Sequence, residues 1–314
     1  MSRCLISFGA NIGNALETIR EASSALQLAL TKTSSQSAQE TQYQLSRYFR
    51  TPPVGGPVGQ PPFVNAVAAF ETQLSVWEVW EIVRKLEHQF GRERNRRWEA
   101  RKLDLDILLF DDQRVWTPQL KVPHPRMCMR RFILLPACDV AAEWIDPVSR
   151  FPLGKLASNL QTRPASLVAF LEDQAIAKPL LIEVGLQARA NWVGPEDSHP
   201  ATSAHDRWMA ISSFFSDAIG SKLDHKHAAS TNLAVFLVGS PTQENECEAM
   251  RTGQDGAWED RHRQIAEQLR LTPASGHALK FDGPRYLLDA SDPQWAIHEL
   301  VAAFDAMDCP VEPF

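Results

Sequence analysis

The segment KLDLDILLF places two acidic side chains inside an otherwise apolar, strand-like run. Successive residues of a β-strand point to opposite faces of the sheet. Asp104 and Asp106 must therefore share one face, while Leu103, Leu105 and Ile107 share the other. Because the apolar face needs a hydrophobic layer to pack against, the segment predicts a sheet strand that presents two carboxylates on its opposite face.

Apolar periodicity predicts the elements that precede this strand. Strands are expected at residues 3–8, 43–50, 63–71 and 102–109, and helices at residues 16–30 and 75–90. The second helix has clear ends, because Ser75 and Glu78 have capping-box spacing and Gly91 suits a helix stop. The resulting order is βαββαβ. It predicts an α+β fold, a ferredoxin-like sandwich with helices on one face of an antiparallel sheet.

A second domain is expected from the length of 314 residues. The pattern weakens between about Ser158 and Lys178, so we divide the chain into a domain at 1–165, a linker at 166–178 and a smaller α/β domain at 179–314. In that second domain, strands are expected at residues 180–185, 233–239 and 285–289, and helices at residues 207–219, 258–269 and 295–307.

The charge of the chain is distributed unevenly. Between Arg84 and Arg131 there are 13 Lys and Arg residues against 7 Asp and Glu, whereas residues 180–314 carry 10 against 20. A basic segment within a chain of net charge −6 favours a local anion site over a nucleic-acid surface. We expect neither nucleic acid nor a membrane as a partner, since no apolar run has the ~20 residues that span a bilayer.

Cysteine usage indicates a reducing compartment. The five cysteines are scattered and form no CxxC pair, so neither a disulfide framework nor a zinc site is predicted. We therefore expect a cytoplasmic protein. His225 and His227 have spacing that permits metal binding, but in a polar loop such a pair is more often simply solvated.

An arginine-rich stretch directly precedes the two aspartates. Five arginines lie in the stretch from Arg92 to Arg101. Paired carboxylates suit Mg²⁺, which shares its coordination shell with substrate phosphates, and guanidinium groups bind phosphate oxygens in forked geometry. The alternative is a solvated charge run whose arginines neutralise the acids. Together the two features favour a polyphosphate site, although the chain has neither a Walker phosphate loop nor protein-kinase motifs.

Four stretches of the first half resemble one known family. They are FGANIGN (8–14), YFRTPPVGGPVGQPPFVNAV (48–67), LEHQFGRERNRRWEARKLDLDILLF (86–110) and VPHPRMCMRRFILLP (122–136). Their order and spacing over residues 1–160 are similar to those of the 6-hydroxymethyl-7,8-dihydropterin pyrophosphokinases of folate biosynthesis. The resemblance implies a ferredoxin-like enzyme that transfers pyrophosphate from ATP to the pterin hydroxymethyl group and releases AMP.

The resemblance also implies a role for each matching residue. Asp104 and Asp106 would hold two Mg²⁺ ions, and Asp106 would also serve as a proton acceptor. The residues implied in catalysis are Arg92, Arg97, Trp98, Arg101 and Asp106, those at the ATP site are Glu87, Arg92, Arg101, His124 and Arg130, and those at the pterin are Thr51, Pro52, Val54, Phe63, Asn65 and Phe132. Departures from the family pattern occur at Arg84, Cys128 and Met129.

The second half leaves several interpretations open. Residues 180–188 and 284–307 resemble parts of a deoxynucleoside kinase whose phosphate loop is missing. The leading prediction is a pyrophosphokinase that acts on ATP and a hydroxymethyl-dihydropterin and carries an accessory domain. The alternatives are a bifunctional protein with a second kinase or binding function, and a binding or assembly protein whose pterin site has decayed. A homodimer, or association with other folate enzymes, is also compatible with the sequence.

Overall fold

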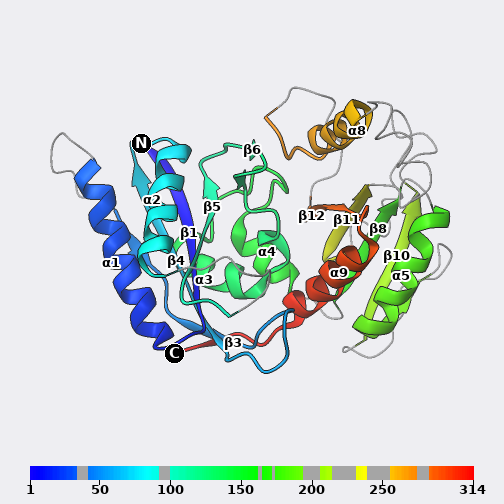
Figure 1. The fold of residues 1–314 in the computed structure, drawn as a ribbon, viewed down its shortest axis with the longest axis horizontal. Coiled ribbons are helices and arrows are strands. Elements are labelled where there is room, and N and C mark those ends of the chain that lie inside the picture. The colour runs from blue at the N-terminus through cyan, green and yellow to red at the C-terminus, as the bar shows by residue number, and fades with distance from the viewer. Residues whose placement is uncertain are drawn as a thin grey trace. The chain divides into compact units, whose positions relative to one another are not determined.

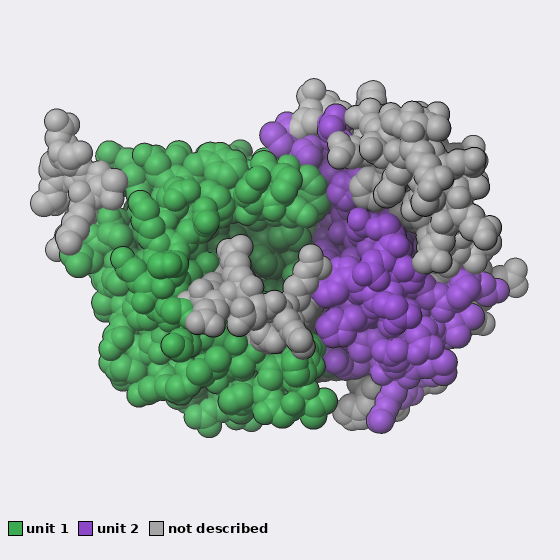
Figure 2. Space-filling view, viewed as in Figure 1, with its two compact units in different colours: residues 1–158, 308–314 green, residues 159–307 purple. Residues whose placement is uncertain are grey.

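The computed structural model describes residues 1–33, 42–91, 100–161, 165–171, 174–193, 206–213, 231–238, 255–273 and 283–314. The chain divides into two compact units, which Figure 2 shows in green and purple. Unit 1 comprises residues 1–158 and 308–314, and unit 2 comprises residues 159–307. The chain thus leaves unit 1 earlier than predicted, and it returns there with its last seven residues.

Unit 1 is built on an antiparallel sheet whose strands come from residues 2–110 and from residues 312–313. They are β1 (Ser2–Ala10), β2 (Gln44–Leu45), β3 (Phe49–Thr51), β4 (Phe63–Thr72), β5 (Asp104–Phe110) and β13 (Glu312–Pro313). The order across the sheet is β13-β3-β4-β1-β5, and β2 pairs separately with β4. The four strands expected in the first half are therefore present, with the segment 43–50 divided into two short strands.

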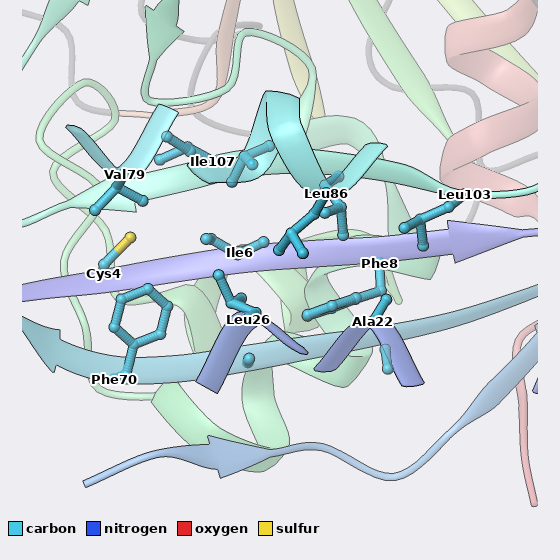
Figure 3. Close-up of a cluster of buried hydrophobic side chains, with 14 of the residues drawn as sticks. Cys4, Ile6, Phe8, Ala22, Leu26, Phe70, Val79, Leu86, Leu103 and Ile107 are labelled. Atoms are coloured by element: carbon cyan, nitrogen blue, oxygen red, sulfur yellow. The ribbon is translucent and has the colours of Figure 1, made fainter. Parts of the chain in front are cut away.

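Helices α1 (Ala15–Thr33) and α2 (Val76–Gln89) supply the apolar layer for one face of this sheet. Figure 3 shows Ile6 and Phe8 of β1 packed between Leu26 of α1 and Leu86 of α2. The predicted capping box begins α2, because Glu78 N–H donates to Ser75 Oγ over 3.3 Å while Glu78 Oε2 accepts from Ser75 N–H over 2.8 Å. This layer leaves the opposite sheet face for other elements.

The opposite face is partly covered by the segment that follows β5. This segment contains the hairpin β6 (Val115–Trp116) and β7 (Lys121–Val122), the 3-10 turn η1 (Met127–Met129), and helices α3 (Arg131–Ala141) and α4 (Leu153–Asn159). Helix α3 packs against β4. The helices of unit 1 therefore lie on both faces of the sheet, in contrast to the one-sided arrangement that we expected.

Unit 2 contains a parallel sheet with the strand order β12-β11-β8-β10-β9. The elements are β8 (Ser166–Leu171), α5 (Gln174–Ala188), β9 (Ala190–Trp192), β10 (Arg207–Ser213), β11 (Leu233–Val238), α8 (Asp255–Gln268), β12 (Arg285–Asp289) and α9 (Pro293–Asp308). All residues of β8 and β11 are buried, as expected for strands covered on both faces. Figure 1 shows α5, α8 and α9 around this sheet.

Three predictions for this half are wrong. The proposed linker contains β8, the central strand of the sheet, and residues 180–185 lie within α5. Residues 207–213 form β10, although a helix was expected from 207 to 219. A short apolar run looks alike in a buried helix and a buried strand, so periodicity alone misassigned both segments. Strands β11 and β12 and helices α8 and α9 agree with prediction. No described helix is long and apolar enough to span a bilayer.

Candidate active site

The two aspartates lie at the start of β5 and project from the face opposite to α1 and α2. In the register with β1, Asp104 is opposite Gly9 and Asp106 is opposite Ser7. Their side chains remain 21% and 35% exposed, whereas Leu103, Leu105 and Ile107 are buried in the core cluster. The predicted division of this strand into an apolar and an acidic face is confirmed.

A polar row crosses the sheet beside the acids. Gly9 is paired with Asp104 on one side and with Asn65 of β4 on the other, so the three residues form one row. A Cβ atom at Gly9 would lie 3.5 Å from Asn65 Oδ1 and 3.9 Å from the Cβ of Asp104. Because Gly9 has no side chain, no atom beyond the backbone separates Asp104 of β5 from Asn65 of β4 at this position.

Asn65 is held in place by Thr51. Its Nδ2 donates a hydrogen bond to Thr51 Oγ1 over 2.9 Å, and both side chains are buried. Phe63 lies two residues earlier on β4 and therefore on the same face, opposite Thr51 of β3. Phe132 lies in the first turn of α3, the helix that packs on β4. Pro52 and Val54 lie in the loop that leaves β3.

Basic groups approach the acids from two segments. The Arg101 guanidinium forms an ion pair with Asp104 Oδ2. His124 Nε2 lies 3.7 Å from Asp106 Oδ2, and His124 Nδ1 accepts a hydrogen bond from the Arg126 N–H over 3.2 Å. Burial and the positive charges of Arg130 and Arg126 lower the His124 pKa well below its usual value, although Asp104 opposes this shift. His124 is therefore neutral, with its Nε2 proton directed toward the acids.

Glu87 fixes the acidic strand from the helix side. Its carboxylate is buried on α2, and Oε1 accepts the backbone N–H of Leu105 over 3.0 Å. Leu105 lies between the two aspartates, so this bond fixes the part of the backbone from which both acids project. A contact of Glu87 with ATP stays a prediction, as do the roles of the other matched residues. Arg92, Arg97 and Trp98 lie outside the described residues.

Asn11 is a residue of this site whose role the sequence reasoning missed. Its Oδ1 accepts the Arg101 N–H over 2.7 Å, its Nδ2 donates to the Pro61 carbonyl over 3.2 Å, and its backbone N–H donates to the Arg101 carbonyl over 3.0 Å. Buried Asn11 thus joins the end of β1 to the exits of two loops. Its position in the matched stretch FGANIGN could have indicated a role at the site. No sequence pattern, however, predicts that its hydrogen-bond partners are Arg101 and Pro61.

The three departures from the family pattern lie on the surface of α2 and in the turn η1. Arg84 sits on the exposed side of α2, 4.8 Å above the Trp80 ring and 3.9 Å from Glu81 Oε1. Cys128 and Met129 are buried in the turn η1. Within the described residues, all three serve surface contacts or packing.

The donor set fits Mg²⁺ that shares its ligands with a substrate. Within the parts of the chain that the structure describes, no three His, Cys, Asp or Glu side chains converge as a protein-only metal site. Two hard carboxylates on one strand face, both partly exposed, suit an ion that keeps waters or phosphate oxygens as its remaining ligands. Residues Asp104 and Asp106 therefore fit the metal that the resemblance implies.

Comparison with known proteins identifies the family. The model of the 7,8-dihydro-6-hydroxymethylpterin-pyrophosphokinase (HPPK) family matches residues 5–142. The 2-amino-4-hydroxy-6-hydroxymethyldihydropteridine pyrophosphokinase of Haemophilus influenzae is 33% identical over 150 residues, which cover 48% of this chain and 88% of that enzyme. The Bacillus subtilis enzyme of the same name is 36% identical over 138 residues, covering 44% of this chain and 77% of that protein. The chain belongs to the HPPK family.

The similarity to solved structures that extends beyond the first half is much weaker than the similarity to these two enzymes. A crystal structure of an HPPK-DHPS protein in complex with substrates covers 78% of this chain and 71% of its own, but with 10% identity and a TM-score of 0.37. A likeness of that size carries no argument about unit 2. The resemblance to deoxynucleoside kinases has no support in these comparisons, and its proposed first strand, residues 180–188, lies in α5.

Proposed function

We propose that this chain transfers pyrophosphate from ATP to the hydroxymethyl group of 6-hydroxymethyl-7,8-dihydropterin and releases AMP. Family membership supports the activity. The single structural observation that carries it is the row Asn65–Gly9–Asp104, which sets a buried polar group for a flat heterocycle beside an acidic strand for a polyphosphate.

The two substrates require different surroundings, and each has a matching set of residues. A flat pterin needs aromatic walls with convergent polar groups, which Phe63, Phe132 and Asn65 would supply. With Nδ2 bonded to Thr51, Asn65 keeps Oδ1 for an N–H of the pterin. Triphosphate oxygens would be met by Arg101, which is paired with Asp104, by the neutral His124 beside Asp106, and by Arg130, whose charge acts on His124.

The reaction would proceed by in-line attack of the pterin hydroxyl on the β-phosphorus, with AMP as the leaving group. When bound by Asp104 and Asp106, two Mg²⁺ ions would neutralise charge on the polyphosphate. The protein itself would position the two substrates and stabilise the developing charge, which together account for most of the catalysis in phosphoryl transfer. Asp106 is the residue that we assign to accept the hydroxyl proton, and His124 would donate a hydrogen bond from its Nε2–H to a phosphate oxygen.

Several finer assignments belong to the same proposal. We infer that unit 1 is ferredoxin-like, since β3, β4, β1 and β5 have the antiparallel order that this fold requires. Unit 2 is assigned as an accessory domain. A second kinase or binding function there stays a prediction, because residues 172–173 after β8 and the segments that follow β10 and β11 lie outside the described residues.

The decisive experiment is an AMP-release assay on the full chain with ATP, Mg²⁺ and 6-hydroxymethyl-7,8-dihydropterin. AMP formation in step with pterin pyrophosphate is the expected result. A reaction that yields ADP, or AMP at the same rate without pterin, would show a different activity. Omitting the pterin and omitting Mg²⁺ are the matched controls.

A further inference from the structure

The last residues of the sequence add a strand to the sheet of unit 1. Strand β13 pairs antiparallel with β3, with Glu312 opposite Arg50 and Pro313 opposite Phe49. The Phe314 N–H donates to the Tyr48 carbonyl over 3.0 Å. This bond follows Pro313, which has no N–H of its own; the missing donor is tolerated because β13 is an edge strand. Figure 1 shows the red end of the chain running beside β3.

Phe314 also makes side-chain contacts with β3 and the residue before it. Its ring centroid lies 6.4 Å from that of Tyr48, and the Arg50 guanidinium carbon lies 5.0 Å from the Phe314 centroid. Half of the Phe314 side chain is exposed, and its ring meets Tyr48 and Arg50 on either side of Phe49. Residues 312–314 therefore contact residues 48–50 through both backbone and side-chain atoms.

That piece of chain leads directly into the predicted pterin-binding residues. Strand β3 has only three residues and ends at Thr51, which binds Asn65. Its inner edge pairs with β4, where Phe49 is opposite Asn65 and Thr51 is opposite Phe63. A three-residue edge strand has few bonds to fix its position, so a partner on its outer edge restricts where Thr51 and the following Pro52–Val54 can lie.

We propose that residues 312–314 are a positioning segment for the pterin-binding strand, supplied by the end of the chain beyond unit 2. This inference rests on the proposed function, because it takes Thr51, Asn65 and Phe63 as pterin-binding residues. The family match ends at residue 142, so the segment is an addition of this chain to the matched region. Its effect falls on the pterin and leaves the ATP site unchanged, since Asp104 lies on β5 at the opposite edge of the sheet.

The test compares the full chain with a chain that ends at Val311 and with Phe314→Ala. The truncation removes the hydrogen bond from Phe314 N–H to the Tyr48 carbonyl and the contact of Arg50 with the Phe314 ring, whereas Phe314→Ala removes only the ring contact. We expect the pterin KM to rise roughly three- to tenfold, while the ATP KM stays within about twofold. Phe314→Tyr keeps an aromatic ring for Arg50 and should restore the pterin KM. Trp77→Ala on α2 removes another exposed aromatic side chain and serves as the control.

Two outcomes separate this inference from the proposed function. An active full chain and an equally active chain ending at Val311, with the same pterin KM, would overturn the positioning role. So would an equal rise in both KM values, which indicates general loosening. Direct titration of 6-hydroxymethylpterin in the presence of Mg²⁺ and α,β-methylene-ATP decides the matter without turnover. A full chain that releases no AMP defeats the proposed function, whereas an unchanged pterin Kd on removing residues 312–314 defeats the positioning role.

Discussion

Asn11 Oδ1 accepts the backbone N–H of Arg101 over 2.7 Å, which ties the end of β1 to the residue that pairs with Asp104. The same side chain donates to the carbonyl of Pro61 at the exit of the Pro- and Gly-rich loop. One buried amide therefore sets the distance between the chain segments that lead to the acids and to Phe63. The site depends on Asn11 although we place no substrate in contact with it.

Asn11→Ala should lower both stability and turnover. The substitution leaves partly buried N–H and C=O groups without partners, which costs about 1–3 kcal/mol. Asn11→Asp keeps the acceptor for Arg101 but loses the donor to Pro61, so it should retain more activity than Asn11→Ala. Urea unfolding and AMP release on the same preparations check both statements. Equal loss of activity in the two variants would contradict the separate roles of the two bonds.

Asp104→Asn and Asp106→Asn should each abolish Mg²⁺-dependent AMP release while leaving the fold intact. Removing one charged group that stabilises a transition state costs roughly 10²-fold or more in kcat. Asp112→Asn, at an exposed position just beyond β5, is the matched control. Mg²⁺ titration of the rate distinguishes a weakened metal site from a lost base. Activity within tenfold of the parent in either variant would remove that aspartate from the metal site.

Asn65→Ala should act on the pterin and spare ATP. The buried amide joins Thr51 to the polar row and offers Oδ1 to the heterocycle, and each such hydrogen bond contributes about 1 kcal/mol or more. A rise of roughly tenfold or more in pterin KM is expected, with the ATP KM unchanged. Steady-state kinetics with each substrate varied in turn measures both. Gln73→Ala, exposed just beyond the same strand, should change neither value.

Features that depend on residues close together in the sequence could be predicted, and most features that depend on distant residues could not. The acidic face of β5 and the capping box of α2 depend on residues a few positions apart, so both were predicted. The pairing of β13 with β3 joins residues from opposite ends of the sequence, and two exposed residues carry no pattern that predicts it. The bonds of Asn11 to Arg101 and Pro61 also join residues far apart in sequence, 90 and 50 positions respectively. Residues 180–185 were predicted as a strand but lie in helix α5. An apolar run indicates that a segment is buried, but it does not distinguish a helix from a strand.

The ion pair between Arg47 and Asp139 predicts an acid-sensitive contribution to stability near the pterin strand. Arg47 donates from Nη2 to Asp139 Oδ1 over 2.7 Å and from Nε to Asp139 Oδ2 over 2.9 Å, which ties the chain before β3 to α3. These bonds hold the pKa of the Asp139 carboxyl below its usual value. A carboxyl pKa that is lower in the folded state stabilises the protein above the unfolded pKa of about 3.9. That contribution is lost as the pH falls through the folded pKa.

Asp139→Asn should therefore reduce the free energy of unfolding at pH 7 by about 0.5–1 kcal/mol, a small value because the Arg47 side chain is 64% exposed. The difference from the parent should begin to shrink as the pH falls below about 4, and it should vanish below the folded pKa of Asp139, where the parent carboxyl is protonated in both states. Urea unfolding at a series of pH values between 3 and 7 measures it. Glu143→Gln, an exposed acid just beyond α3, should leave the free energy of unfolding unchanged at pH 7. A difference that stays constant down to pH 3 would mean that packing, and not the charge of Asp139, holds Arg47 in place.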